Sequence, residues 1–184
     1  TRYSSSAASD VYKRQIQDHT NSNNALLIDS SGRVTEPAKP YLFAGNAGGQ
    51  NVTPTGFTGV IPYDTVRGAS GISLNTSTFK FTVPVTGLYN ISANIRINAN
   101  RTYLYWAVVD DNGGSPQVLA DADGGNNIVM GIGSSSGPGF SAAVGSVLQR
   151  LQTGKTYYLR CADSSGSAVA VQGNQTWLHI HLVG

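Results

Sequence analysis

The chain has 184 residues. Charged residues make up 12% of the chain, and 22 residues are glycine. An average globular protein has about 25% charged residues. Residues 1–15 contribute the whole net charge of +2, because the other residues include nine basic and nine acidic side chains. A nucleic-acid partner would therefore depend on residues 1–15 alone, and no apolar run approaches the roughly 20 residues of a membrane span. Length and composition predict one turn-rich globular domain with an appendage.

The first segment stands apart from the rest of the chain. Residues 1–15 read TRYSSSAASDVYKRQ. This string is similar to translated sequencing-adapter read-through at the edges of metagenomic gene fragments. We therefore expect residues 1–15 to be foreign to the fold, and the protein to come from an uncultured source.

Residues 16–40 are predicted to form a short β-rich neck. Two strand-like pieces, residues 25–29 and 33–35, flank a DSSG sequence that favours a tight turn. Pro37 and Pro40 then stiffen the exit, because proline cannot donate a hydrogen bond to a sheet. This piece has too few apolar residues to bury itself, so it needs neighbouring copies or the following domain. An ordinary surface hairpin is the alternative interpretation.

From residue 41 onward the pattern is β to the end of the chain. Candidate strands lie at residues 41–44, 58–61, 78–83, 88–97, 102–109, 127–132, 143–151, 155–162 and 176–183. Pro84 and Gly87 mark a corner between two of them, and no apolar pattern of helical period exceeds about ten residues. The strand spacing predicts an all-β sandwich of two antiparallel sheets, without separating a jelly roll from an immunoglobulin-like sandwich.

Five phrases in residues 40–184 together resemble the tumour-necrosis-factor-like and complement (one-q) globular heads. They are IPYDTV at 61–66, TFKFTVP at 78–84, GLY at 87–89, VLQRLQTGKTY at 147–157 and TWLHIHL at 176–182. Lys155 and His179 depart from that pattern, where an Asp and a small residue are usual. The resemblance implies a jelly roll, with residues 41–184 as its head, and a homotrimer in which one sheet of each subunit faces its neighbours.

The neck and the two-sided strands agree with such a trimer. The phrase ALLIDSSGRVTEPAKP is similar to junctions in bacteriophage virion fibres, where it precedes a C-terminal globular domain. In the last strand, apolar side chains alternate with aromatic and histidine side chains, so both faces can be covered. The expected trimer interface consists of Tyr103, Tyr105, Trp177, His179 and His181.

His179-Ile180-His181 is the first of two possible metal-binding patterns. Both imidazoles lie on one face of a strand, where they can bind a transition metal or form a pH-responsive ring. Cupins use such a pair, but the downstream ligands of a cupin site are missing here. The second pattern is Asp121 and Asp123 in a turn that superficially resembles a calcium loop but lacks its distal Glu. Packing and turn chemistry explain both patterns, so no metal or cofactor is predicted.

Catalytic patterns are missing from the sequence. It contains no G-x-S-x-G, H-E-x-x-H or P-loop string, and Glu36, its sole Glu, lies outside the head. Cys161 is the sole cysteine and sits in an apolar run, which predicts a buried, inert thiol. We therefore expect a protein that is not an enzyme.

The predicted function is that of a trimeric virion fibre head, on an extracellular particle, for host attachment or particle decoration. The neck would join it to upstream virion proteins, and turns would bind a host-surface glycan or protein. The expected binding loops contain Asp110, Asp111, Asn112, Ser134, Ser135 and Phe140. Two alternatives are a secreted complement-like lectin or adhesin and a cupin-type metal enzyme. Neither membrane insertion nor a nucleic-acid partner is expected.

Overall fold

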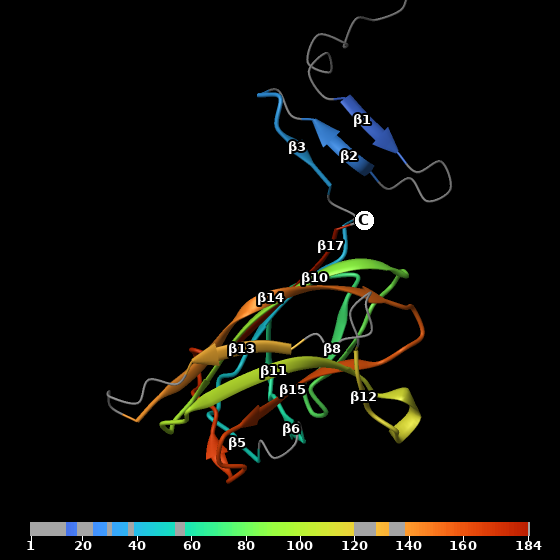
Figure 1. Ribbon diagram of the computed structural model, residues 1–184. Helices are drawn as coiled ribbons and strands as arrows, with labels where there is room; N and C mark the ends of the chain where they lie inside the picture. Colours follow the sequence, from blue (N-terminus) through green and yellow to red (C-terminus); the bar gives the residue numbers. More distant parts are fainter. Residues whose placement is uncertain are drawn as a thin grey trace, which may run out of the picture. The chain divides into compact units, whose positions relative to one another are not determined.

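A computed structural model describes residues 14–17, 24–28, 31–36, 39–53, 58–119, 128–132 and 139–183. The chain divides into two compact units, Thr1–Lys39 and Pro40–Gly184. Regular structure in the described ranges is almost entirely β (Figure 1), with one 3-10 turn, η2, at Asn112–Gly114. Within these ranges, no helix has the length and apolar character needed to cross a membrane.

The first unit contains a small antiparallel sheet. Its strands are β1 (Arg14–Gln17), β2 (Asn24–Ile28) and β3 (Val34–Thr35), in the order β1-β2-β3. β2 and β3 coincide with the two strand-like pieces in the sequence, and Gly32 between them adopts a φ of 76°. β1 begins at Arg14, inside the segment that the sequence sets apart as foreign. Its pairing with β2 therefore involves the last two residues of that segment.

The second unit, which we call the head, is a sandwich of two main sheets. In the described residues, one sheet has the order β14 (Ser141–Leu151), β10 (Gly87–Ile97), β17 (Trp177–Leu182), β4 (Tyr41–Gly45), β7 (Thr65–Ser70). The other has the order β12 (Gln117–Val118), β11 (Tyr103–Asp110), β15 (Tyr157–Asp163), β9 (Lys80–Thr82), β8 (Ser73–Asn75).

Shorter strands complete the head. β13 (Ile128–Ile132) pairs with β11, β6 (Gly59–Val60) pairs with β15, and β16 (Val169–Ala170) pairs with β5 (Asn51–Val52). Every pairing among the described strands is antiparallel, and Figure 1 shows β10 and β14 in a layer over β11, β13 and β15. The predicted sandwich of two antiparallel sheets is confirmed.

The hydrophobic core fills the space between the two sheets. Along β10, every second side chain from Tyr89 to Ile97 is fully buried, and the intervening side chains point to the other face. Leu104, Trp106 and Val108 of β11 meet them from the second sheet. Each large apolar side chain buried in this way contributes about 1.5–3 kcal/mol, so burial of the alternating side chains stabilises the stacking of the two sheets.

The Pro84–Gly87 corner carries the chain from one sheet to the other. β9 ends at Thr82 in the second sheet, and β10 begins in the first. The hydroxyl of Tyr89, which is buried, donates a hydrogen bond of 2.8 Å to the carbonyl of Val85. This bond ties the new strand to the corner, because the buried hydroxyl must find a partner.

Phe79 differs from its predicted place in a strand at residues 78–83. Its φ of 60° lies in the left-handed region, and β9 begins only at Lys80. The Asn75 side chain accepts hydrogen bonds from the backbone of Ser77 (2.9 Å) and Thr78 (3.0 Å). Such an Asx turn competes with strand pairing, so the hairpin between β8 and β9 turns where the sequence predicts an extended chain.

Strands β7 and β8, which lie at sheet edges, were not predicted from the sequence. None of the six residues of β7 is buried, and β7 contains Gly68. An edge strand has one partner and little buried surface, so it needs no apolar alternation. Alternation of apolar and polar residues appears only where one face of a strand is buried, so it does not reveal β7 and β8.

Cys161 is buried, as the sequence predicts. Burial, with a smaller contribution from the charge of Asp163, raises its thiol pKa to about 12. We expect a maleimide to leave the native protein unlabelled at pH 7.5 and to label Cys161 fully in denaturant, because only the exposed thiolate reacts. Mass spectrometry measures both results. Rapid labelling of native protein would contradict this placement.

Candidate functional site

The outer face of the five-stranded sheet carries aromatic side chains where a monomeric sandwich would be polar. In β17, Leu178 and Ile180 are buried in the core, whereas Trp177, His179 and His181 alternate with them and are only half-buried. The two-sided character predicted for this strand is confirmed. The backbone period of two puts all three outward side chains on one face.

Strand β4 extends this aromatic surface. Phe43 is paired with His179, and Tyr41 is paired with His181. The ring of Phe43 meets that of His179 edge-on, at 90° and 6.3 Å between centroids. Tyr41, Phe43, Trp177 and His179 line an open groove with a volume of about 490 Å³. Tyr41 and Phe43 were absent from the predicted interface residues, although their alternation with buried Leu42 was the available signal.

Exposed apolar side chains recur at the opposite edge of the same face, beyond an outward row of β10 that is mostly polar. On β14, Val144 is 62% exposed and Leu148 is 57% exposed, and on β10 Leu88 is also exposed. Leu148 is paired with Asn90, which is paired in turn with His181. We call this surface, made of the outward side chains of β4, β17, β10 and β14, the open face. Several large apolar side chains exposed on one sheet face favour a site of association.

The two histidines form a close pair on the open face. Their ring centroids are 5.1 Å apart, with 35° between the ring planes. Burial, and then the proximity of His181, lower the pKa of His179. The Nδ1 atom of His181 is buried and has no hydrogen-bond partner in the described part of the chain. Burial therefore favours the neutral form of the His179 imidazole.

Tyr103 and Tyr105, the other two predicted interface residues, lie on the second sheet. Their rings stack in parallel, with 5.0 Å between centroids and 5° between planes. They belong to β11, whereas Trp177, His179 and His181 belong to β17 in the first sheet. The five residues predicted for one interface therefore lie on two sheets. The sequence could not show this division, because strand periodicity says nothing about which sheet a strand joins.

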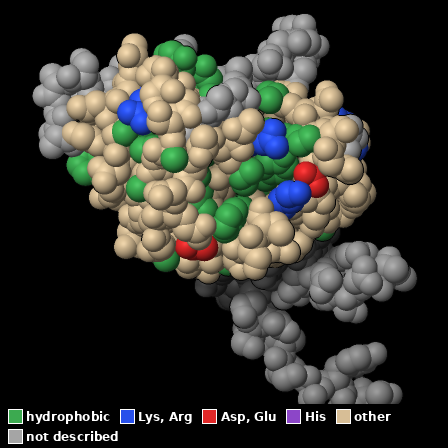
Figure 2. All heavy atoms as spheres, turned by 90° about the horizontal axis from the view of Figure 1, so that it is seen from below, with side chains coloured by type: hydrophobic (Ala, Val, Ile, Leu, Met, Phe, Trp, Pro, Cys, Tyr) green, Lys and Arg blue, Asp and Glu red, His purple; other side chains and the backbone are tan. Residues whose placement is uncertain are grey.

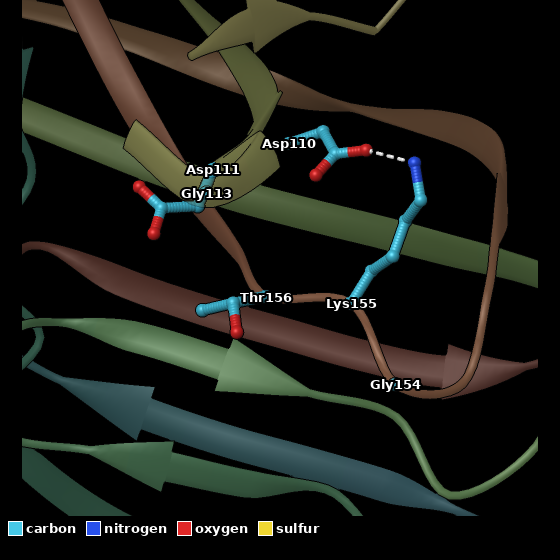
Figure 3. A pocket seen from close by; sticks show the side chains of 6 residues that line it. All are labelled: Asp110, Asp111, Gly113, Gly154, Lys155 and Thr156. Atoms are coloured by element: carbon cyan, nitrogen blue, oxygen red, sulfur yellow. Dashed lines mark hydrogen bonds and ion pairs between the residues drawn. The ribbon is translucent and has the colours of Figure 1, made fainter. Parts of the chain in front are cut away.

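A second feature is a polar pocket at the end of β11. Asp110, Asp111, Gly113, Gly154, Lys155 and Thr156 line it, and its volume is about 470 Å³. Lys155 donates to Asp110 at 2.5 Å, as Figure 3 shows, and Lys80 donates to Asp111 at 2.8 Å. The hydrogen bond and charge of Asp110 raise the pKa of Lys155. Lys80, Lys155 and Thr156 were absent from the predicted site residues, although the departure at Lys155 was a signal.

The remaining predicted binding residues are only partly described. Phe140 is half-buried, and the guanidinium of Arg96 lies 4.4 Å from its ring centroid. Asn112 lies in η2 beside the polar pocket. Asp121, Asp123, Ser134 and Ser135 lie outside the described residues. No group of three or more potential metal-ligating side chains occurs in the described ranges of this single chain.

Charged side chains are sparse on the face of the head seen from below. Figure 2 shows mostly backbone and uncharged polar side chains there, with a central apolar strip flanked by a few basic and acidic side chains. No histidine of the described residues is visible on this face. Recognition through it would depend on shape and uncharged groups, since charge guides binding mainly where one sign is concentrated.

Comparison with solved structures shows the fold. Over about 80% of its length the chain is similar to the Eiger TNF of S. frugiperda, with 12% identity, 94% of that chain covered and a TM-score of 0.53. It is similar to murine APRIL in crystals at pH 8.5 and pH 5.0, with 11% identity, 79% of this chain and 99% of that chain covered, and TM-scores of 0.54 and 0.55. No protein-family model and no curated protein matches the sequence. The head is thus a TNF-like jelly roll, which confirms the predicted fold.

Proposed function

We propose that the head is a trimeric binding and structural module, and that the open face packs its three copies together. The observation that carries this proposal is the exposure of Phe43, Val144 and Leu148 on one sheet face. Full burial of such side chains contributes about 1.5–3 kcal/mol each. A threefold arrangement gains this contribution three times over, whereas a monomer leaves the same surface in water.

The mass of the full 184-residue chain in solution tests this proposal. Light scattering at micromolar concentration should give three times the chain mass of 19.3 kDa. A closed ring of three uses heterologous contacts, in which different parts of the open face meet. A mass of one or two chains would overturn the proposal.

We further propose that this trimer is the tip of a virion fibre that attaches to a host surface or decorates the particle. The fibre-like neck phrase supports this role, because its two short strands, β2 and β3, form a hairpin that is marginally stable alone. Three copies of a weak site would bind with useful avidity. Binding of the fluorescently labelled trimer to candidate host cells, with a monomeric variant as control, tests the attachment role.

The outward position of the histidine pair bears on the enzyme alternative. His179 and His181 point away from the sandwich core, whereas Leu178 and Ile180 point into it. A cupin-type metal site needs its ligands inside the barrel, and in the described part of the chain no third ligand joins the pair. These observations favour a non-enzymatic role.

The polar pocket is our candidate for ligand recognition by the head. Its charges are paired within the protein, Lys155 with Asp110 and Lys80 with Asp111. The pocket therefore presents hydroxyl, backbone and carboxylate groups without a concentrated charge, which suits a neutral polyhydroxylated ligand such as a glycan. Loops on a rigid scaffold commonly hold such sites.

A glycan array probed with the trimer tests this pocket. Lys155→Ala should lower the signal on bound glycans at least tenfold, because it removes one donor from the pocket and breaks the hydrogen bond between Lys155 and Asp110. Lys39→Ala is the control, since Lys39 pairs with Glu36 in the first unit. If both variants bind glycans equally well, or if the wild-type protein binds no glycan, the pocket is not the ligand site.

A further inference from the structure

We propose that His179 and His181 form part of a binding site for a divalent transition metal on the threefold axis, and that the same side chains of the two other copies complete it. This inference rests on the trimer proposed above. The strand places both imidazoles on the open face with their ring centroids 5.1 Å apart. Zinc is bound by histidine nitrogens at about 2.0–2.1 Å, and small side-chain rotations bring two rings at this separation onto one ion.

The Nδ1 atom of His181 is a second, independent sign of a missing partner. It is buried, and it makes no hydrogen bond to the described residues. A buried ring nitrogen normally has a hydrogen-bond partner, and leaving one unpaired costs about 1–3 kcal/mol. A metal bond, or a hydrogen bond formed when a metal orients the ring through its other nitrogen, would satisfy this atom.

The surroundings explain why one chain cannot complete the site. In register beside the two histidines lie Asn90 and Ser92 on β10, with Tyr41 and Phe43 on β4. None of these four is a carboxylate or thiolate. Two imidazoles leave at least two positions of a tetrahedral ion open. On the proposed threefold axis, the histidines of the two other copies supply chemically suitable ligands.

The ligand type narrows the choice of metal. Imidazole suits zinc, copper and nickel, whereas magnesium and calcium require oxygen ligands. The third histidine of the sequence, His19, belongs to the first unit and provides a matched control. Zinc chloride and nickel chloride are therefore the probes, and calcium chloride is the negative probe.

Calorimetric titration of the full chain, with light scattering before and after EDTA, tests the site. We expect zinc and nickel to bind the wild type and His19→Gln equally. We expect His179→Gln and His181→Gln to bind at least tenfold more weakly. A variant that breaks the trimer, Leu148→Arg, should also bind at least tenfold more weakly although both histidines remain, because the neighbouring ligands are lost.

The possible failures are distinguishable. A trimer that binds neither zinc nor nickel, or binds them equally well without His179 and His181, overturns the metal site and leaves the trimer proposal intact. A single-chain mass with and without metal overturns the trimer proposal and the completed site together. Undiminished binding by monomeric Leu148→Arg overturns only the contribution of neighbouring copies.

Discussion

Replacement of Leu148 by arginine is expected to convert the trimer into a monomer. Leu148 is 57% exposed in the single chain, so the folded monomer loses little packing. In the proposed trimer, three new guanidinium groups would be buried without partners, beside the existing Arg150 side chains of β14. Removing one partner of a buried pair, which leaves a single buried charge unpaired, costs about 3–5 kcal/mol, and the ring repeats the penalty three times.

The matched control is Val85→Arg. Val85 is also exposed, at 45%, but it lies in the corner between β9 and β10 and is not part of the open face. Light scattering at equal concentration should give a single-chain mass for Leu148→Arg and a three-chain mass for Val85→Arg, with unchanged circular dichroism in both. A trimeric Leu148→Arg would show that β14 lies outside the subunit interface.

The second large effect is expected at Asp163, where β15 ends. Its side chain is fully buried and accepts hydrogen bonds from Arg101, from the backbone of Ser165 (3.0 Å) and from the backbone of Gly166 (2.7 Å). Asp163→Ala leaves the Arg101 guanidinium, 16% exposed, and two backbone donors without this acceptor. Breaking a buried ion pair from one side costs about 3–5 kcal/mol.

Asp111→Ala is the comparison for this loss. Asp111 pairs with Lys80 at 2.8 Å, but their side chains are 23% and 32% exposed, so water screens the pair. Such pairs are worth about 0–1 kcal/mol. Urea unfolding at one fixed protein concentration, which matters because association adds to apparent stability, should show a much lower midpoint for Asp163→Ala than for Asp111→Ala. Equal midpoints would contradict the role assigned to the buried pair.

The fold was predictable where strands are buried on one face. The alternation in β10 and β17 directly reflects which side chains leave water, so both strands appear in the sequence within two residues of their observed bounds. Phe79 and β7 were not predictable in this way. The conformation of Phe79 depends on an Asx turn at Asn75. The strand β7 lies at a sheet edge and has no buried residue.

The candidate sites were predictable only in part, because they combine residues from distant segments. His179 and His181 were found because they are two residues apart on one strand. Phe43 and Leu148 join the same face only through the pairing of β4 with β17 and of β14 with β10. The ion pair of Lys80 with Asp111 spans 31 positions.

By itself, the sequence determined the all-β class, the core face of each long strand and the unreactive environment of Cys161. These properties depend on the local alternation of apolar and polar side chains, which a single segment contains. Only the tertiary structure decided which strands share a sheet. That choice separated Tyr103 and Tyr105 from Trp177, His179 and His181, because strand order arises from long-range hydrogen bonding that local periodicity does not encode.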